Sequence, residues 1–321
     1  MVHASHKSLW TDAQLKNAWD LILVSKKITL LTHHKPDGDG ISACAALSRV
    51  FSALGKEIEA VYPSVSEYNY TRESARVHVG MHTQMPDLLI ACDTANYDRL
   101  YYPEAFKKIP LINIDHHVSN SIQGTINFVD GKASSTCEMV YDLLLTWAPN
   151  YITSDVAECI LFGMLYDTQV FQSQAVTAKT LRVAADLVER GANLFQLKTE
   201  LLSDKNPRII SFWGMLMSRI TLSPQGNAAW SVVRQRDFVD HGVKPSVLLG
   251  FNNFLAQISG VDVTILFYET PDGKTKISLR SKHADVNKLA ARFGGGGHTN
   301  AAGILSVTPI DQLVQELTDC L

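Results

Sequence analysis

The fold is decided within residues 27–55, which read KITLLTHHKPDGDGISACAALSRVFSALG. The first six residues form a largely apolar, β-branched run with the length of a strand. After a short polar segment, apolar residues recur at every third or fourth position and the pattern stops at Gly55, which is typical of a helix. A strand followed at once by a helix is the first part of a parallel βαβ unit.

The same alternation continues through the first part of the chain. Further strands are predicted at 57–62, 87–92, 109–114 and 125–129, and helices at 135–147, 154–166 and 177–190. The predicted class is α/β, with a largely parallel sheet flanked by helices. Later segments predict a smaller α/β domain, with helices at 208–219, 247–258, 286–293 and from 310, and strands at 228–234, 261–268, 274–280 and 301–307.

The length and composition predict a globular protein of two domains. At roughly 150 residues per domain, 321 residues correspond to about two. The contents of 46% apolar and 19% charged residues exclude disordered, collagen-like and coiled-coil chains. We place the first domain at residues 1–190, a linker at 191–207, where the pattern weakens into a polar stretch, and the second domain at 208–321.

The charge is nearly balanced overall but unevenly distributed. A formal net charge of −3 argues against a protein that coats long DNA or an anionic membrane. Residues 205–300 hold 12 Lys and Arg against 6 Asp and Glu, a net charge of +6, which leaves −9 for the rest. An acidic first part and a basic second part suit a metal site in one and a phosphate site in the other.

Cysteine usage and the apolar runs indicate the cellular setting. The five cysteines include no C-x-x-C pair, which argues against a disulfide framework and a structural zinc site. The N-terminus has no apolar signal core, and no stretch reaches the 18 or so apolar residues of a membrane span. We therefore expect a soluble cytoplasmic protein with no membrane partner.

Carboxylates and imidazoles follow the predicted strands of the first domain. The residues concerned are His33, Asp37, Asp39, Asp93, Asp115, His116 and His117. In open α/β sheets ligands bind at the carboxyl ends of the strands, so these side chains should converge. Each motif alone has a plainer explanation: a turn at 36–40, a helix cap at Asp93, and a surface loop or core histidine pair at 115–117. Their shared position at strand ends favours a site.

Asp167 strengthens this interpretation. It continues the apolar face of the helix at 154–166, where a carboxylate needs a partner or a metal ion unless the helix end already faces water. Four Asp and at least two His, without Cys, suit Mn²⁺ or Mg²⁺, with Co²⁺ or Zn²⁺ as substitutes in vitro. Two divalent cations would balance four carboxylates, and such a centre hydrolyses phosphate esters or anhydrides.

A second motif, Gly294-Gly-Gly-Gly-His298, lies between a predicted helix and a predicted strand. Successive glycines let backbone N–H groups close on an anion. The motif is neither a dinucleotide fingerprint nor a Walker loop, because the order of elements and the Lys-Ser/Thr pair are missing. A flexible linker is the alternative, but Arg280, Lys282 and His283 shortly upstream favour an anion site.

Together these residues resemble the DHH family of phosphoesterases, in the branch that carries the DHH-associated C-terminal domain. The matching motifs are Thr32–Asp39, Ala91–Thr94, Asp115–His117 and Gly163–Thr168 in the first domain and 278–281 and 294–303 in the second. The resemblance runs from about residue 28 to residue 307 in the family's order, and the size is similar to that of the bacterial nano-RNase/pAp phosphatases. Gln169 departs from the family, because many relatives have glycine there, and this leaves the shape of the pocket wall open.

The resemblance implies two metal ions with Asp93 between them. One ion would be held by His33, Asp37 and Asp93, and the other by Asp39, Asp93, His116 and Asp167. The catalytic residues would be Asp93, Asp115 and His117, with His117 contacting the scissile phosphate and Asp115 orienting its neighbours. Besides His117, the substrate would be bound in the second domain, where its far phosphate or terminal nucleotide would contact Arg280, Gly295, Gly296, Gly297 and His298.

The function implied is a manganese-dependent phosphoesterase with two Mn²⁺, or with Mg²⁺ or Co²⁺ in their place. It would release mononucleotides from short single-stranded RNA (nanoRNA) and dephosphorylate the nucleotide bisphosphate 3′-phosphoadenosine 5′-phosphate (pAp). Alternatives are a phosphodiesterase for linear or cyclic dinucleotides, an inorganic pyrophosphatase or exopolyphosphatase, and a nucleotide sensor without turnover. The glycine motif with His298 argues against pyrophosphate, and the full ligand set argues against a sensor. A homodimer is expected from the family alone.

Overall fold

The computed structural model describes residues 10–34, 36–62, 76–79, 82, 84–100, 102–202 and 206–320. The chain divides into two compact units, Met1–Ser203 and Asp204–Leu321. The N-terminal residues 1–9 and residues 203–205 of the expected linker lie outside the described residues. The linker region also contains helix α6 (Leu194–Leu202), whose Leu197 is buried in the core of the first unit.

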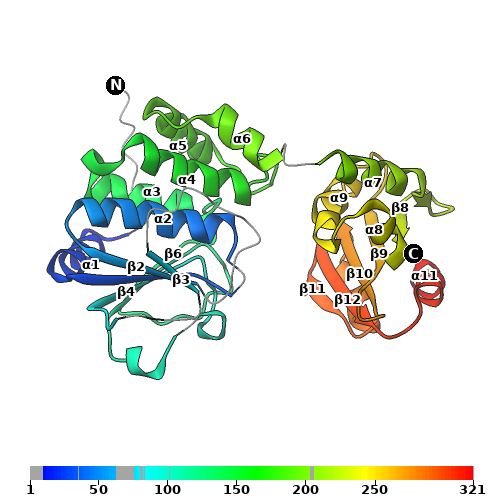
Figure 1. Cartoon of the computed structure of the whole chain (residues 1–321), viewed down its shortest axis with the longest axis horizontal. Coiled ribbons are helices and arrows are strands. Elements are labelled where there is room, and N and C mark those ends of the chain that lie inside the picture. The colour runs from blue at the N-terminus through cyan, green and yellow to red at the C-terminus, as the bar shows by residue number, and fades with distance from the viewer. Residues whose placement is uncertain are drawn as a thin grey trace. The chain divides into compact units, whose positions relative to one another are not determined.

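The first unit is built on a parallel sheet covered by helices (Figure 1). Its strands are β1 (Lys27–Leu31), β2 (Glu57–Tyr62), β3 (Arg76–Val79), β4 (Leu88–Cys92), β5 (Leu111–Asp115) and β6 (Ile126–Val129). Its helices are α1 (Asp12–Val24), α2 (Gly38–Ala53), α3 (Thr136–Trp147), α4 (Ser154–Asp167), α5 (Ala178–Glu189) and α6, with 3₁₀ turns η1 (Tyr97–Arg99), η2 (Glu104–Phe106) and η3 (Pro149–Tyr151).

The order of these strands fixes where a ligand would bind. The sheet runs β3-β2-β1-β4-β5-β6, and every neighbouring pair is parallel. The direction of winding therefore reverses between β1 and β4. In doubly wound sheets this switch point opens a crevice at the carboxyl ends of the strands.

Both faces of the sheet are buried, as expected for parallel strands. On one face the strands pack under α2, α3 and α4, which Figure 1 shows stacked over the sheet. On the other face Leu31, Leu89 and Ala91 form a second cluster with Phe106 of η2. All five residues of β4 are buried, and Asp93 follows directly at the carboxyl end of this strand.

The predicted α/β class and parallel sheet are confirmed, and the five predicted strands correspond to β1, β2, β4, β5 and β6. Helix α1, strand β3 and helix α6 were not predicted. Strand β3 reads Arg-Val-His-Val at the edge of the sheet, and a four-residue strand with two apolar positions gives too little periodicity to identify.

The second unit is a mixed sheet between two helical layers. Its elements are α7 (Pro207–Ser218), β7 (Thr221–Leu222), β8 (Ala228–Val233), α8 (Gln235–His241), η4 (Pro245–Val247), α9 (Leu248–Leu255), β9 (Val263–Glu269), β10 (Thr275–Ser281), α10 (Val286–Arg292), β11 (Gly296–His298), β12 (Ala301–Ser306) and α11 (Ile310–Thr318). The strand order is β11-β12-β10-β9-β8-β7, in which β8 and β9 are parallel and the other pairs antiparallel. One apolar cluster joins the sheet to α10 and α11, and another joins it to α7, α8 and α9.

Two local features of this unit bear on the predictions. The hairpin expected around Pro271-Asp-Gly273 is present between β9 and β10, and Gly273 takes a left-handed φ of +76° in its turn. The glycine motif differs from the expected loop, because Gly296–His298 form the edge strand β11 paired with β12. The last three residues of the motif are therefore held by backbone pairing with β12.

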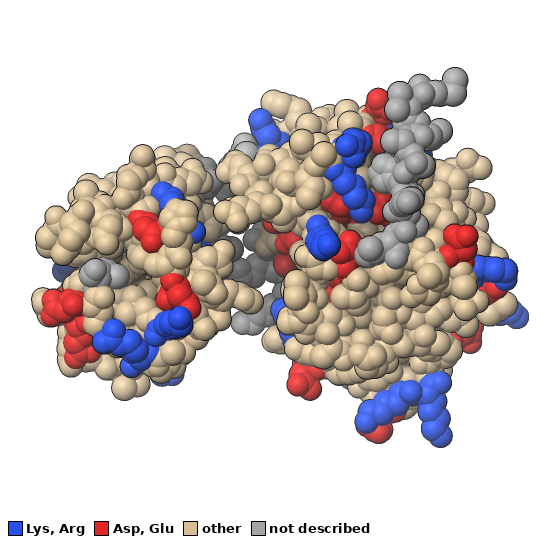
Figure 2. All heavy atoms as spheres, turned by 180° about the vertical axis from the view of Figure 1, so that it is seen from behind, with Lys and Arg blue, Asp and Glu red and all other residues tan. Residues whose placement is uncertain are grey.

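The surface agrees with the small net charge. On the face shown in Figure 2, Lys and Arg are interspersed with Asp and Glu over both units. Among the described residues, no helix has the length and apolar character required to cross a membrane.

Candidate metal centre

The six side chains predicted as metal ligands lie in one cluster at the carboxyl ends of β1, β4 and β5 and the end of α4. Three groups have ligand atoms within 4.8 Å of one another: Asp93 with His116 and His117, His33 with Asp37 and Asp93, and Asp39 with His116 and Asp167. These groups share members, so the cluster is continuous. The convergence expected at the strand ends is therefore present, while the role of each residue as a ligand stays a prediction.

His33 and Asp37 form one side of the cluster. The Nε2 atom of His33 lies 3.6 Å from Asp37 Oδ2 and 3.5 Å from Asp93 Oδ2, and its Nδ1 lies 2.9 Å from the carbonyl oxygen of His34. Asp37 is also the N-cap of α2, where its Oδ1 accepts from the backbone N–H of Asp39 and Gly40. The predicted turn at 36–40 is thus a helix start that leaves the second oxygen of Asp37 facing His33.

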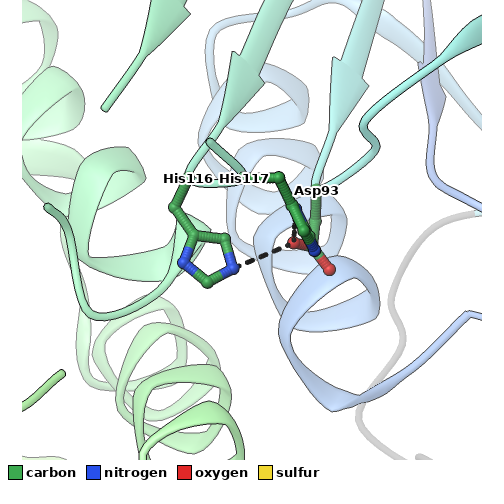
Figure 3. A group of neighbouring side chains, drawn as sticks. All are labelled: Asp93, His116 and His117. Atoms are coloured by element: carbon green, nitrogen blue, oxygen red, sulfur yellow. Dashed lines mark ion pairs between the residues drawn. The ribbon is translucent and has the colours of Figure 1, made fainter. Parts of the chain in front are cut away.

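Asp93 lies at the centre. Its Oδ2 faces His33, and its Oδ1 lies 3.6 Å from both His116 Nε2 and His117 Nδ1. Figure 3 shows the ring of His116 pointing toward this carboxylate with His117 beside it. Asp93 has a left-handed φ of +57°, and the next helical turn, η1, begins at Tyr97 and is capped by Asn96, so Asp93 does not cap a helix. Strained backbone at a residue of this kind is characteristic of functional sites.

Asp39 is fully buried in the first turn of α2. Its Oδ2 accepts from the N–H of Thr136 at 2.6 Å and its Oδ1 from the N–H of Cys137 at 3.0 Å, both at the start of α3. Burial raises the pKa of Asp39 well above its usual value, and the charges of Asp93 and Asp167 raise it further. Gly163 allows this approach, because a Cβ there would lie 2.9 Å from Asp39 Oδ1.

His116 and Asp167 complete the other side. His116 Nε2 lies 3.3 Å from Asp167 Oδ2, and His116 Nδ1 lies 3.4 Å from the carbonyl oxygen of Ala133. Asp167 is the last residue of α4, with 26% of its side chain exposed, and it faces His116 instead of open water. Burial raises the pKa of Asp167 to about 6, and the charges of Asp93 and Asp37 act in the same direction.

Asp115 and His117 form a hydrogen-bonded pair beside the cluster. His117 Nδ1 lies 2.7 Å from Asp115 Oδ1, and Asn120 donates to Asp115 Oδ2 at 2.6 Å. Asp115 is fully buried, whereas 36% of the His117 side chain is exposed. The hydrogen bond with Asp115 raises the pKa of His117, so the cationic form of the imidazole is favoured. His117 is therefore held by Asp115 through Nδ1, and its ring is partly exposed.

The cluster has the chemistry of a divalent metal site. Its donors are carboxylate oxygens and imidazole nitrogens, which suit Mn²⁺ and its neighbours in the series. The raised pKa values of Asp39 and Asp167 show that burial and mutual repulsion make their ionised forms unfavourable without a cation. Divalent cations would remove that repulsion, so the residues fit the predicted metals.

Sequence reasoning missed several residues that hold the ligands. Thr136 contacts Asp39 and Asp93, and Asn120 contacts Asp115 and the carbonyl oxygen of Thr94. Arg99 of η1 brings its Nη2 to 3.3 Å from His33 Nδ1. The only sequence signal for any of these was the predicted helix start at 135, because Asn120 lies in a loop and Arg99 in a three-residue 3₁₀ turn, neither of which has periodicity.

Gln169, where many relatives of the family have glycine, begins a turn of unusual backbone conformation. Gln169, Val170 and Phe171 follow α4 with left-handed φ values of +51°, +58° and +62°. Glycine takes this backbone without strain, whereas other residues lose about 1–2 kcal/mol each. Val170 and Phe171 pack against the core of the first unit, and this burial offsets the strain. The chain thus makes the turn after Asp167 without glycine.

The residues predicted to bind substrate in the second unit share one face of its sheet. Arg280 pairs with Ala301, Ala301 pairs with His298, and Arg280 also pairs with Thr264 on its other side. Directly opposed residues point to the same face, so Arg280 and His298 flank the small side chain of Ala301. Burial lowers the pKa of Arg280, and among the described residues it makes no ion pair with a carboxylate. A half-buried guanidinium of this kind is suited to an anion.

Gly295 and Gly297 lie where the backbone of the glycine motif comes close to that of β12. A Cβ at Gly295 would lie 2.3 Å from the carbonyl oxygen of Gly303, and one at Gly297 would lie 2.4 Å from that of Ala301. Glycine is therefore required for the pairing of β11 with β12. Gly296 lies between them on the exposed edge strand. Their part in binding stays a prediction.

Comparisons with known proteins identify both units. The family model described as "DHH family, N-terminal domain" matches residues 27–164, and the "DHHA1 domain" model matches residues 226–321. The first match contains five of the six predicted ligands, and Asp167 lies three residues beyond its end. Arg280 and His298 fall within the second match.

Two curated relatives cover nearly the whole chain. The "Bifunctional oligoribonuclease and PAP phosphatase NrnA" of Bacillus subtilis is 29% identical over 298 residues, which cover 90% of this chain and 93% of the relative. The protein of the same name from Thermus thermophilus is 29% identical over 303 residues, with 93% and 90% covered. A solved structure, an exopolyphosphatase-related protein from Bacteroides fragilis, shares the fold with a TM-score of 0.88 and 21% identity, over 98% of this chain and 97% of that chain.

Proposed function

The chain belongs to the DHH family of phosphoesterases and carries a DHHA1 domain, and on this premise we propose that it is a manganese-dependent hydrolase of short RNA and pAp. The observation that carries the proposal is the position of Asp93, whose two carboxylate oxygens face His33 on one side and His116 on the other. A carboxylate in this position is suited to bridge two cations. The activities stated in the names of the two relatives, oligoribonuclease and PAP phosphatase, support the choice of substrates.

The ligands would hold two divalent cations in the manner expected from the sequence. His33, Asp37 and Asp93 would hold one, and Asp39, Asp93, His116 and Asp167 the other. Such a pair supplies Lewis-acid activation of water and of the phosphoryl group. The protein's own contribution is to keep these side chains in place through the caps and backbone N–H groups described above.

His117 is proposed to contact the phosphoryl group directly. Asp115 holds Nδ1, so Nε2 is the ring atom that remains for a ligand. The raised pKa favours the doubly protonated ring, which can donate a charge-assisted hydrogen bond to a phosphoryl oxygen. Asp115 itself is buried and held by Asn120, so it acts by orienting His117.

The second unit supports a nucleotide as substrate. We propose that Arg280, His298 and the glycines of β11 bind a second phosphate or a terminal nucleotide, because they combine a guanidinium without a carboxylate partner among the described residues with an exposed imidazole on one face. The small net charge of the chain also favours a short ligand over a long polyanion.

The function is tested by a panel of substrates on one metal-stripped preparation returned to Mn²⁺, Mg²⁺ or Co²⁺. The panel contains RNA of two to five nucleotides, a longer RNA, pAp, linear and cyclic dinucleotides, and pyrophosphate. We expect Mn²⁺ to restore hydrolysis of the shortest RNA and of pAp at the highest kcat/KM. Preference for cyclic dinucleotides or for pyrophosphate would contradict the proposed substrates, and no turnover with any metal would contradict an enzyme.

Removal of Arg280 or His298 is expected to weaken substrate binding more than turnover. Each residue would contribute a charge-assisted hydrogen bond of about 1.5–3 kcal/mol, so Arg280→Ala should raise KM for pAp roughly 10- to 100-fold. His298→Ala should raise KM in the same direction. Steady-state kinetics at saturating Mn²⁺ measure both effects, and Arg292→Ala, at an exposed position of α10, is the control. An unchanged KM for both variants would assign nucleotide binding elsewhere.

A further inference from the structure

The predicted ligands come from separate elements, so contacts between elements must set their spacing. Residues 130–137, which join β6 to α3 and include the first two residues of α3, contact three of the predicted ligands. The Ala133 carbonyl oxygen lies near His116 Nδ1, the first two N–H groups of α3 bind Asp39, and the Thr136 hydroxyl binds Asp93. This segment carries none of the residues assigned to metal or substrate.

Thr136 is the residue that joins two carboxylates. Its backbone N–H donates to Asp39 Oδ2 at 2.6 Å, and its Oγ1 donates to Asp93 Oδ1 at 3.2 Å. Asp39 belongs to α2 and Asp93 follows β4, so one residue links two elements that are 54 positions apart in the sequence. Thr136 is fully buried, so water does not compete for its hydroxyl.

The position of Thr136 at the start of a helix explains why it can make both contacts. The first N–H groups of a helix have no partner within it, and the carboxylate of Asp39 accepts two of them. Ser135 is the N-cap and accepts from the N–H of Glu138 through its own hydroxyl. The Thr136 side chain is therefore not used as a cap and remains directed at Asp93.

The hydroxyl is also the closest partner of the central carboxylate. The three histidine nitrogens around Asp93 lie 3.5–3.6 Å from its oxygens, farther than the 3.2 Å to Thr136 Oγ1. Asp93 also has a left-handed backbone, which persists only where the surrounding contacts determine it. Among the described residues, Thr136 supplies the hydrogen bond to this carboxylate.

Thr136 is itself held rigidly. The buried carboxylate of Glu138 accepts from Ser134 Oγ at 2.6 Å and from Thr180 Oγ1 at 2.8 Å. Lys179 Nζ lies 3.1 Å from Glu138 Oε1. These contacts tie the first turn of α3 to the residue just before it and to α5, so Thr136 has little freedom to shift.

We propose that Thr136 is a positioning residue whose hydroxyl and backbone N–H set the spacing of Asp93 and Asp39 for two divalent cations. The inference rests on the proposed function only in assuming that these carboxylates bind metal. Partners of metal ligands that act in this way change metal affinity about 10- to 100-fold when they are removed. The effect should appear in metal binding itself, independently of any substrate.

The test is Mn²⁺ binding to the full chain, measured by calorimetry and by the electron paramagnetic resonance signal of free Mn²⁺. Thr136→Val keeps the shape and the backbone N–H and removes the hydroxyl, and we expect the Mn²⁺ Kd to rise 10- to 100-fold. Thr136→Ser keeps a hydroxyl and should stay within threefold of the original protein. Thr146→Val is the matched control on the same helix, because the Thr146 hydroxyl donates only to the backbone of Asp142.

Activity separates positioning from general damage. In Thr136→Val, activity lost at low Mn²⁺ should return at saturating Mn²⁺, with KM for substrate unchanged. Unchanged Mn²⁺ affinity in a folded Thr136→Val variant would overturn the proposal. If that variant does not fold, Thr136→Ala removes the same hydroxyl and replaces it in the test. Unfolding of both variants would show a purely structural role and would also overturn it.

The result for the original protein distinguishes this inference from the proposed function. Two bound Mn²⁺ without hydrolysis of RNA or pAp would refute the proposed substrates and leave the positioning role to be decided by the variants. Failure of the original protein to bind Mn²⁺ would overturn the positioning role as well.

Discussion

Asp93→Ala is expected to abolish turnover with every substrate, with a fall in kcat of about 10³-fold or more. Asp93 belongs to two of the three ligand groups and faces each with a different oxygen. Its Oδ2 faces His33, and its Oδ1 faces His116 and His117. Its removal would separate the two halves of the site. Two-metal activation is worth several kcal/mol, and about 1.4 kcal/mol corresponds to a tenfold change in rate. Single-turnover assays with Mn²⁺, together with the stoichiometry of bound Mn²⁺, measure the loss.

The fold should survive this substitution. The charge of Asp93 adds to burial in raising the pKa of Asp39, so its removal relieves a repulsion in the metal-free protein. The substitution also removes the contact with His33 and the hydrogen bond from Thr136, which oppose this gain, so the thermal midpoint without metal should stay close to that of the original protein. Asp98→Ala, at an exposed position of η1 five residues away, is the control and should keep full activity. An Asp93→Ala variant with near-normal Mn²⁺-dependent activity would show that the bridging assignment is wrong.

Much of the first unit could be predicted because its strands and helices have strong periodicity. The runs that became β1, β4 and β5 are largely apolar, since parallel strands covered on both faces bury nearly every residue. The strand order itself was not predictable, because it depends on which strands pair, and residues on β1 pair with β2 and β4 alike. The rule that ligands collect at strand ends nevertheless predicted, without that order, that these side chains converge.

The clustering of these Asp and His side chains could be predicted from the sequence, and the residues that hold them in place could not. An Asp or His directly after a predicted strand suggests a ligand site by its residue type and position alone. Thr136 and Asn120 make hydrogen bonds to carboxylates of the cluster, and neither a Thr at a helix start nor an Asn in a loop has a distinctive sequence pattern. The pairing of Arg280 and His298 with Ala301 was likewise invisible, because register is set by backbone hydrogen bonds across the sheet.

The protonation of His33 should make Mn²⁺ binding strongly dependent on pH. Burial alone would lower the pKa of His33, but its contacts with Asp37 and Asp93 outweigh burial and raise the pKa to about 10. The metal-free protein therefore carries an imidazolium at neutral pH, and a cation bound at Nε2 must expel that proton. Burial raises the pKa of Asp167 to about 6, so a second proton competes below that pH.

The sign of the effect follows from these two groups. Between pH 6.5 and 8.5 the ion held by His33 displaces one proton, so its Mn²⁺ Kd should fall about tenfold per pH unit. Below about pH 6 the ion held by Asp167 should become dependent on pH as well, because Asp167 must ionise to bind it. Calorimetry in pairs of buffers with different heats of ionisation counts the released protons, and we expect more protons to be released at pH 5.5 than at pH 7.5. Asp167→Asn should bind more weakly and lose the added dependence below about pH 6 while keeping the dependence above pH 6.5, because His33 is unchanged. A Kd that is constant from pH 6 to 8, with no proton released, would mean that His33 is already neutral in the metal-free protein and that its contacts with Asp37 and Asp93 do not hold an imidazolium.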